Sequence, residues 1–397
     1  MARAVIVDAV RSPMGKGKAT GGLAGVHPVD LLAQVLSALV ARNGLDPGTV
    51  DDVVIGCVGQ NGQQSATPGR QAWLSAGFPT HVPSMTVERK CGSGQQAVDI
   101  AAWGIGASVY DIAIAGGVES MSRVPMSSNR MGADPFDRRV HERFPHLAPQ
   151  GVSAELVAQK WSLTREQLDA YSADSHRRAE AARSAGGFVD EIVPITVPDS
   201  DVAFAVDETI RPGSTTESLG ALRAAFATDE YRGRFPGVDW KVTAGNSSQL
   251  TDGASALLLM SEERAAMLGL RPRARILASA VCGDDPILML TGPIPATRKV
   301  LERAKLALSD IDAVEINEAF ASVPLAWAAE FDIDPALVNP RGGAIALGHP
   351  LGASGARLMT TILHHLEQTG GRYGLQTMCE AGGMANATIV ELLDVSA

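Results

Sequence analysis

The chain has 397 residues with a formal net charge of −10, and hydrophobic residues make up 45% of it. This length and composition suffice for a large buried core in two or three domains, and they exclude a collagen-like, coiled-coil or disordered chain. The acidic balance argues against a surface that binds nucleic acid or anionic membranes, so positive contacts to an anionic ligand have to be local.

The four cysteines, Cys57, Cys91, Cys282 and Cys379, are far apart in the sequence and form no C-x-x-C pair. This spacing argues against a disulfide framework or a structural zinc site and fits a reducing compartment. The first residues show no basic leader before an apolar run, and no apolar run reaches the roughly 18 residues of a membrane span. We therefore expect a cytoplasmic protein.

Strand-like and helix-like patterns alternate in the first part of the chain. An apolar strand is expected at 3–9, a helix through 31–40, a second strand at 51–58, a helix opened by Cys91-Gly-Ser-Gly and a third strand at 111–117. Such alternation predicts an α/β architecture with a largely parallel sheet.

The same order of elements recurs in the last part of the chain. A strand at 273–281 is followed by a helix at 296–308, a strand at 311–319, a helix opened by His349-Pro-Leu-Gly and a strand at 372–383. Two copies of one βαβ-rich unit, packed with their sheets side by side, explain this recurrence better than chance likeness does.

The segment between the copies, about 119–250, has a different character. It carries arginine-rich loops, helical patterns around 153–160 and 165–184, and few long apolar runs. Because it cannot build much of a core alone, we interpret it as an excursion mounted on the first copy that covers a site.

If the copies are related by a pseudo-twofold axis, Cys91 and His349 meet where their two helices begin. A helix N-terminus favours a thiolate and lowers a cysteine pKa, and an imidazole beside it can accept the proton. Neighbouring glycines let a substrate approach the backbone, whose N–H groups can stabilise an oxyanion. These features favour a nucleophile at Cys91 over the more common inert core cysteine.

The second copy adds two candidates at strand ends, where open α/β sheets place their sites. Cys379 precedes a flexible Glu-Ala-Gly-Gly turn, and the Asn317 amide could orient a water or an oxyanion. Cys57 and Cys282 lack such surroundings and are interpreted as structural. The glycine-rich run before and after His349 matches no nucleotide-phosphate loop, and no metal site is predicted.

Together these motifs resemble the thiolase family, over essentially the whole chain and in the family's order. The segments that carry the resemblance are CGSGQQA (91–97), GGVESMSR (116–123), GNSSQLTDGA (245–254), NEAFA (317–321), GGAIALGHPLGASGAR (342–357) and the turn that begins at Cys379.

The resemblance implies two duplicated βαβαβαββ halves in a five-layered αβαβα core, with a loop domain inserted into the first half. It places the N-terminal half at 1–118 plus 251–272, the inserted CoA-binding domain at 119–250 and the C-terminal half at 273–397.

The implied reaction is CoA-dependent cleavage of a 3-ketoacyl-CoA to acetyl-CoA and a shortened acyl-CoA, or the reverse Claisen condensation. By the resemblance, Cys91 is the nucleophile, His349 its base, and Cys379 the acid/base at the acetyl-CoA α-carbon. Asn317 would hold a catalytic water, and the N–H groups of Cys91 and Ala381 would form an oxyanion hole.

The resemblance also supplies contacts to coenzyme A, which is a co-substrate and not a resident cofactor. These contacts are Arg211, Phe226, Ala244 and Ser248, and Arg211 would give the polyanionic ligand its local positive charge.

Two departures from the family pattern bear on function. Ala381 stands where glycine is usual, so the turn has to form without glycine's freedom at positive φ, although the N–H remains. Pro149-Gln150-Gly151 replaces the His-Met-Gly of biosynthetic acetoacetyl-CoA thiolases and is similar to degradative actinobacterial enzymes. We therefore expect fatty acid β-oxidation, with biosynthesis of acetoacetyl-CoA as the alternative.

More distant alternatives are a decarboxylating ketosynthase, a hydroxymethylglutaryl-CoA synthase and a non-catalytic thiolase-like protein. The second cysteine, Cys379, disfavours the first two. The family also implies a homodimer or homotetramer acting on CoA thioesters, with a hydratase/dehydrogenase partner left open and neither nucleic acid nor membrane as a partner.

Overall fold

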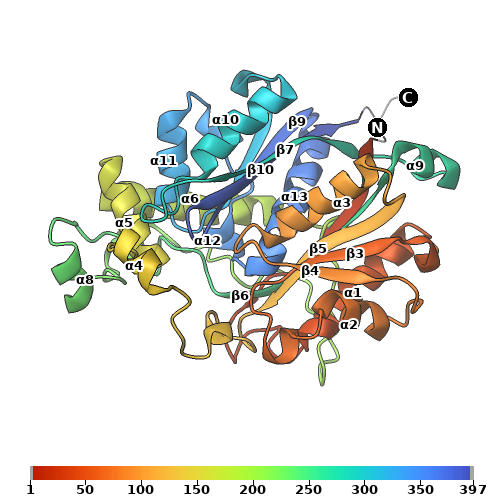
Figure 1. Cartoon of the computed structure of the whole chain (residues 1–397), viewed down its shortest axis with the longest axis horizontal. Helices are drawn as coiled ribbons and strands as arrows, with labels where there is room; N and C mark the ends of the chain where they lie inside the picture. Colours follow the sequence, from red (N-terminus) through yellow and green to blue (C-terminus); the bar gives the residue numbers. More distant parts are fainter. Residues whose placement is uncertain (1–2, 394–397) are drawn as a thin grey trace.

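The structure is a computed structural model that describes residues 3–393. Residues 1–2 and 394–397, the outer ends of the two predicted halves, lie outside the described residues. The two halves are built from equivalent strands and helices, with an inserted helical segment on one side (Figure 1). No helix in the described part of the chain has the length and apolar character that crossing a membrane requires.

The first half supplies β1 to β6 and the helices that cover them. Its elements are β1 (Ala4–Arg11), β2 (Gly15–Lys16), α1 (Pro28–Arg42), β3 (Asp52–Gly56), α2 (Pro68–Ser75), β4 (Ser84–Val87), α3 (Ser93–Gly106), β5 (Ile112–Ser120), β6 (Thr251–Ser261) and α9 (Glu262–Leu268).

The second half repeats the plan. Its elements are β7 (Ala274–Gly283), α10 (Pro293–Ala304), β8 (Ala313–Ile316), α11 (Ser322–Glu330), α12 (Ala344–Leu347), α13 (Leu351–Thr369), β9 (Tyr373–Glu380) and β10 (Met384–Leu392). The inserted segment contributes α4 (Arg138–Arg143), α5 (Gln150–Lys160), α6 (Arg165–Ser184), α7 (Thr216–Gly220) and α8 (Asp229–Arg234).

Strand order confirms the duplication that the sequence predicts. The path runs β4-β3-β5-β6-β1-β7-β10-β9-β8, so β3-β5-β6-β1 of one half is mirrored by β8-β9-β10-β7 of the other. The halves join through a short antiparallel seam in which Val5 pairs with Arg275 and Ile6 with Ala274.

The expectation of a largely parallel sheet is wrong. Only β3 with β4, β3 with β5, and β8 with β9 are parallel among the described pairs, and the other pairs are antiparallel. The long insertion explains this in the first half. β6 follows it and returns between β1 and β5, antiparallel to both, with no crossover helix of its own.

Side chains alternate between the two faces of each sheet and so fill separate cores. Along β6, Leu258 and Met260 pack in the core beneath α1 and α2, whereas Leu257 and Leu259 pack in a central core with α3 and α13. A third core joins β8–β10 to α10 and α11. The resulting layers are helix, sheet, helix, sheet, helix, with α3 and α13 as the shared middle layer (Figure 1).

The two middle helices approach one another through glycine. A Cβ at Gly355 would overlap the backbone nitrogen of Gln95, and one at Gly94 would lie 2.7 Å from the Gly352 carbonyl oxygen. Since real Cβ atoms do not approach backbone so closely, glycine at these positions permits the first turns of α3 and α13 to touch.

Gly355→Ala is therefore expected to destabilise the protein by about 1–3 kcal/mol, the usual cost of inserting a methyl group into a packed interior. Chemical denaturation measures the effect. Gly233→Ala in α8 is the matched control, because a Cβ there meets no atom within 4 Å, and it should leave stability unchanged or slightly raised. Equal stability of the two variants would contradict this account of the helix contact.

Candidate active site

Cys91 and His349 occupy equivalent positions in the two halves. Gly92 is the N-cap of α3 and Cys91 directly precedes it, just as His349 directly precedes Pro350, the N-cap of α13. The buried Cys91 side chain packs in a cluster with Leu351 at the start of α13. The turn that bears the sulfur therefore lies against the turn that bears the imidazole.

Hydrogen bonds fix the orientation of the His349 ring. The Ser354 hydroxyl donates to the Pro350 carbonyl at 2.8 Å, and its oxygen lies 2.6 Å from His349 Nδ1. Because the single hydroxyl hydrogen is donated to the Pro350 carbonyl, the Ser354 oxygen acts as the acceptor toward the ring, so Nδ1 carries the hydrogen and Nε2 keeps its lone pair. Asn317 Nδ2 lies 3.3 Å from that Nε2.

Burial, more than the helix ends, sets the charges of this pair. It lowers the pKa of His349 to about 3, with a further contribution from the Arg357 charge. It raises the pKa of Cys91 to about 12, aided by the Glu380 carboxylate. The expectation that the helix N-terminus lowers the Cys91 pKa is therefore wrong, because desolvation outweighs the helix dipole at a fully buried thiol. Thiol and imidazole are both neutral at rest.

Donors from two other segments reach the Cys91 sulfur. The Gln150 side chain and the Ala381 N–H both hydrogen-bond to it and oppose the rise in its pKa. In the turn after Cys379 the positive φ values fall on Gly382 and Gly383, at 95° and 73°, and not on Ala381. The alanine is thus accommodated without strain, and its N–H points at the sulfur.

The ends of β8 and β9 bring Asn317 and Cys379 to the same place. The Asn317 N–H donates to the Thr377 carbonyl at 3.1 Å, which continues the parallel pairing of the two strands beyond Ile316. Burial and then the nearby Cys91 raise the pKa of Cys379 well above its ordinary value. The two cysteines are close enough that the charge of one opposes ionisation of the other.

Glu380 is a buried carboxyl group behind the Cys91 turn. A Cβ at Gly92 would overlap Glu380 Oε1, and neither carboxyl oxygen has a hydrogen-bond partner among the described residues. Burial raises the Glu380 pKa to about 8; Arg89 opposes the rise and Asp99 adds to it. The group is therefore mostly neutral near pH 7 and becomes an anion beside both cysteines at higher pH.

The residues predicted to contact CoA lie on the side of the inserted segment. Arg211 is exposed, and its Nη2 donates to Gln249 Oε1 at 2.8 Å. Gln249 in turn accepts the His349 N–H through its backbone oxygen at 3.2 Å. Arg211 is thus linked to the His349 backbone through one residue, Gln249, and Ser248 is the sequence neighbour of this glutamine.

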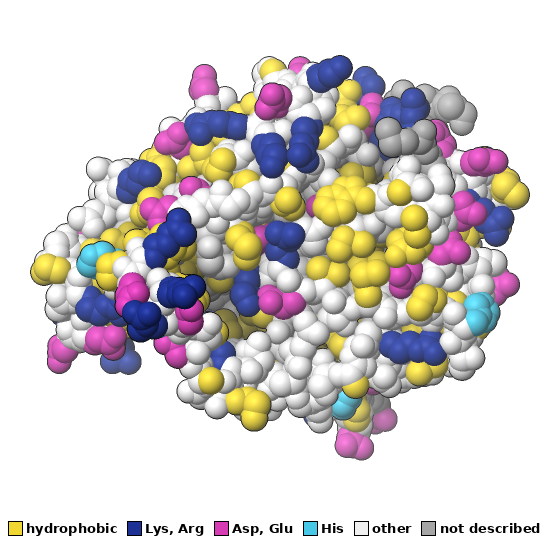
Figure 2. All heavy atoms as spheres, viewed as in Figure 1, with side chains coloured by type: hydrophobic (Ala, Val, Ile, Leu, Met, Phe, Trp, Pro, Cys, Tyr) yellow, Lys and Arg dark blue, Asp and Glu magenta, His cyan; other side chains and the backbone are white. Residues whose placement is uncertain are grey.

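Phe226 and Ala244 lie in other loops of the inserted segment. The Phe226 ring packs against Gly151, where a Cβ would overlap it, and lies 6.2 Å from the Phe320 ring. Ala244 is exposed. Figure 2 shows a hollow at the junction of the inserted segment and the two halves, with basic side chains on its rim. In the described part of the chain no hydrogen bond or ring contact joins these four residues directly, so their grouping as a CoA site stays a prediction.

Three contributors to the site were not predicted from the sequence. In the sequence, Gln150 is part of a loop that differs from that of biosynthetic enzymes, Ser354 is part of a glycine-rich run, and Glu380 is a turn residue. Ser354 had a usable signal, since a serine five residues after a histidine that precedes a helix lies in the first turn. Gln150 reaches the sulfur from a distant segment, and burial of Glu380 depends on tertiary packing.

The remaining two cysteines differ in their burial. Cys57 is buried. Cys282 is half-buried, and the Cys282 sulfur lies 3.5 Å from the Gly292 carbonyl oxygen. No group of three or more His, Cys, Asp or Glu side chains in residues 3–393 is arranged to hold a metal ion.

Comparison with known families agrees with this geometry. The thiolase N-terminal domain model matches residues 4–263, and the thiolase C-terminal domain model matches residues 270–392. The chain belongs to the thiolase family. The N-terminal model thus spans both parts of the predicted first half and the insertion between them.

Individual thiolases match over nearly the full length of the chain. The steroid 3-ketoacyl-CoA thiolase FadA6 of Mycobacterium tuberculosis is 48% identical, with 99% of this chain and 95% of that protein covered. An acetyl-CoA acetyltransferase of Allochromatium vinosum is 41% identical, with 98% of each covered. The crystal structure of the Bacillus anthracis acetyl-CoA acetyltransferase superimposes with a TM-score of 0.88 at 39% identity, covering 99% of both chains.

The position of Glu380 predicts a pH-dependent effect on Cys91. Above about pH 8 the ionised carboxylate raises the Cys91 pKa, whereas glutamine at this position stays neutral. Glu380→Gln should therefore speed Cys91 alkylation by iodoacetamide at pH 9 by roughly three- to tenfold, since one pKa unit changes the thiolate fraction tenfold. At pH 6.5, where Glu380 is neutral, the two rates should agree.

Intact-mass spectrometry after timed alkylation gives both rates, and Cys91→Ala identifies the labelled residue. A rate ratio that does not change between pH 6.5 and pH 9 would show that Glu380 affects Cys91 only through packing.

Proposed function

We propose that this thiolase cleaves 3-ketoacyl-CoA with CoA to give acetyl-CoA and an acyl-CoA shortened by two carbons. The observation that carries the proposal is the single site in which Cys91 and Cys379 lie together beside the His349–Asn317 pair. One thiol is available to bond to the acyl group while the other moves a proton. Names of the relatives, among them 3-ketoacyl-CoA thiolases at 43% identity, support the same reaction.

The first half of the proposed reaction begins from a neutral pair. His349 Nε2 accepts the Cys91 proton as the sulfur attacks the 3-keto carbon, so that no free thiolate has to persist in the buried site. The N–H groups of Cys91 and Ala381 stabilise the resulting oxyanion. The C2–C3 bond then breaks, its electrons form the acetyl-CoA enolate, and Cys379 protonates that carbon.

The second half returns the enzyme to its starting state. His349 passes its proton to the Cys379 thiolate, which restores that thiol. CoA then replaces acetyl-CoA, and His349 accepts the CoA thiol proton as this sulfur attacks the Cys91 thioester. Collapse of the tetrahedral intermediate releases the shortened acyl-CoA and the Cys91 sulfur, which regains its proton from His349. A thiol at Cys379 suits the α-proton of a thioester better than a carboxylate does, because its pKa is closer to that of the carbon acid.

The inserted segment, residues 119–250 in our division of the chain, is proposed to bind the CoA moiety. Arg211 supplies positive charge at the surface, and Phe226, Ala244 and Ser248 border the path toward His349. Gln150 enters the site from this segment and contacts the Cys91 sulfur. We propose that it shapes the pocket for the acyl group.

The degradative direction is favoured over the biosynthetic one. The 48%-identical relative carries the name of a steroid 3-ketoacyl-CoA thiolase, whereas the acetyl-CoA acetyltransferases that we compared are 39–41% identical. Gln150 beside the nucleophile is the local feature consistent with that difference. A role in fatty acid β-oxidation, a cytoplasmic location and a homodimeric or homotetrameric assembly complete the proposal.

Cys91→Ala should abolish covalent acylation of the protein by acetyl-CoA, because no other cysteine lies at a glycine-capped helix start. Intact-mass spectrometry checks the loss of the acetyl adduct. Cys57→Ala, which removes a buried cysteine of the same half, is the control and should retain it. Undiminished labelling of Cys91→Ala would refute the nucleophile assignment.

Cys379→Ala should separate the two halves of the reaction. Acylation of Cys91 by acetyl-CoA needs no proton at carbon and should persist, whereas thiolysis of acetoacetyl-CoA should fall by about a hundredfold or more. Loss of acetoacetyl-CoA absorbance and the mass adduct report the two steps. If both steps fell equally, Cys379 would not be the acid/base at carbon.

A further inference from the structure

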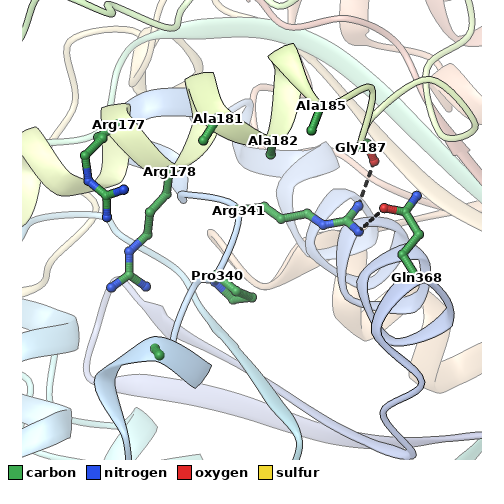
Figure 3. A pocket seen from close by; sticks show the side chains of 10 residues that line it. Arg177, Arg178, Ala181, Ala182, Ala185, Gly187, Pro340, Arg341 and Gln368 are labelled. Carbon is green, nitrogen blue, oxygen red and sulfur yellow. Dashed lines mark hydrogen bonds between the residues drawn. The ribbon is translucent and has the colours of Figure 1, made fainter.

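A second cavity lies away from the cysteines, between α6, the 335–341 segment and the end of α13. Its volume is about 440 Å³, and Figure 3 shows its walls. The residues that line it are Arg177, Arg178, Ala181, Ala182, Ala185, Gly187, Ala336, Pro340, Arg341 and Gln368. Three of them are arginines and none is an aspartate or glutamate, in a chain whose net charge is −10.

Arg341 lines the cavity and is a buried cation without an anionic partner among residues 3–393. Its Nη1 donates to the Gly187 carbonyl at 2.7 Å and its Nη2 to Gln368 Oε1 at 2.6 Å (Figure 3). Its remaining acceptors are the His364 carbonyl and His365 Nδ1, each at 3.3 Å. All four acceptors are neutral.

No described carboxylate lies within ion-pair distance of Arg341, although only 6% of the residue is exposed. A buried charge is normally neutralised by a neighbour, because its desolvation otherwise goes uncompensated. Burial accordingly lowers the Arg341 pKa, and the carboxylates that oppose this, Glu191 and Glu315, act from a distance. The guanidinium also keeps one N–H on Nη1 beyond those four hydrogen bonds.

The outer wall carries excess positive charge as well. Arg177 and Arg178 both pair with Asp174, so two guanidinium groups share one carboxylate. Both arginines extend from α6 along the cavity (Figure 3). The Gln368 amide, whose oxygen faces Arg341, has its nitrogen left to donate.

We propose that this cavity binds a small organic anion that carries a carboxylate or phosphate group. The forked donors of arginine match either group, and the anion would neutralise Arg341. The volume exceeds that of a bare inorganic ion and falls within the range of small-molecule sites. The alanines of α6 offer an apolar wall for the organic part.

The position of the cavity separates it from the proposed catalytic site. Arg341 contacts residues 364, 365 and 368 near the C-terminal end of α13, whereas His349 precedes its N-terminal end. The 19-residue helix between them is about 28 Å long at 1.5 Å per residue. Ligand bound here would therefore not occupy the space of the acyl-CoA.

Ala181→Glu tests the proposal without removing any existing contact, because Ala181 is an exposed residue on the cavity wall. The new carboxylate should compete for the arginines. Ala181→Gln is the matched control, since it adds the same bulk without charge. Binding of pyrophosphate and of succinate to the full-length protein is measured by isothermal titration calorimetry at constant ionic strength.

We expect the wild type and Ala181→Gln to bind at least one of the two probes, and Ala181→Glu to bind it at least tenfold more weakly. Preference for pyrophosphate or for succinate identifies phosphate or carboxylate as the recognised group. Arg211→Gln reports on the proposed CoA region and should leave this binding intact. Equal affinity of the Glu and Gln variants, loss of binding in Arg211→Gln, or no binding by the wild type would overturn the proposal.

Discussion

The contact between the first turns of α3 and α13 brings the predicted nucleophile and its predicted base together. Both helices run through the middle layer between the strands of the two halves, and glycine at their crossing lets backbone touch backbone. Cys91 and His349 stand one residue before the N-caps of these helices, so the helix contact brings their turns together. Side chains larger than glycine at this contact would push the two helices apart and move the Cys91 thiol away from the His349 imidazole.

Burial at this crossing controls the chemistry as well as the geometry. It keeps the imidazole deprotonated and the thiol protonated, against the pull of the helix dipole. The proton therefore moves from the Cys91 thiol to the His349 imidazole during attack, and the resting site holds no thiolate–imidazolium ion pair. Glu380, itself buried and mostly neutral near pH 7, follows the same rule, because in a desolvated site the uncharged form of each group is favoured.

Much of the architecture could be predicted from periodicity and repetition. The strands at 3–9, 51–58 and 111–117 and their counterparts at 273–281, 311–319 and 372–383 all form, in the order that the duplication required. The parallel sheet was a wrong expectation, since spacing along the chain does not reveal that β6 returns between β1 and β5 after the insertion.

The site was less accessible from sequence than the fold. Position at a helix start marks Cys91 and His349, but no local pattern shows that Gln150 reaches the same sulfur or that Glu380 is buried behind it. Likewise, the Cys91 pKa depends on how completely the folded protein excludes water, which a glycine-flanked motif does not encode. Arg341 is a comparable case, because its lack of a carboxylate neighbour is a property of the packed structure.

The mirrored strand order has a consequence for how such a centre can arise. An assembly of two identical half-length chains would carry the same amino acid at both helix starts, giving either two sulfurs or two imidazoles across the axis. Joining the halves into one polypeptide frees the two positions to differ. An acid opposite a base, at symmetry-equivalent places, is thus a chemical asymmetry that a symmetric ancestor of this fold could not have possessed.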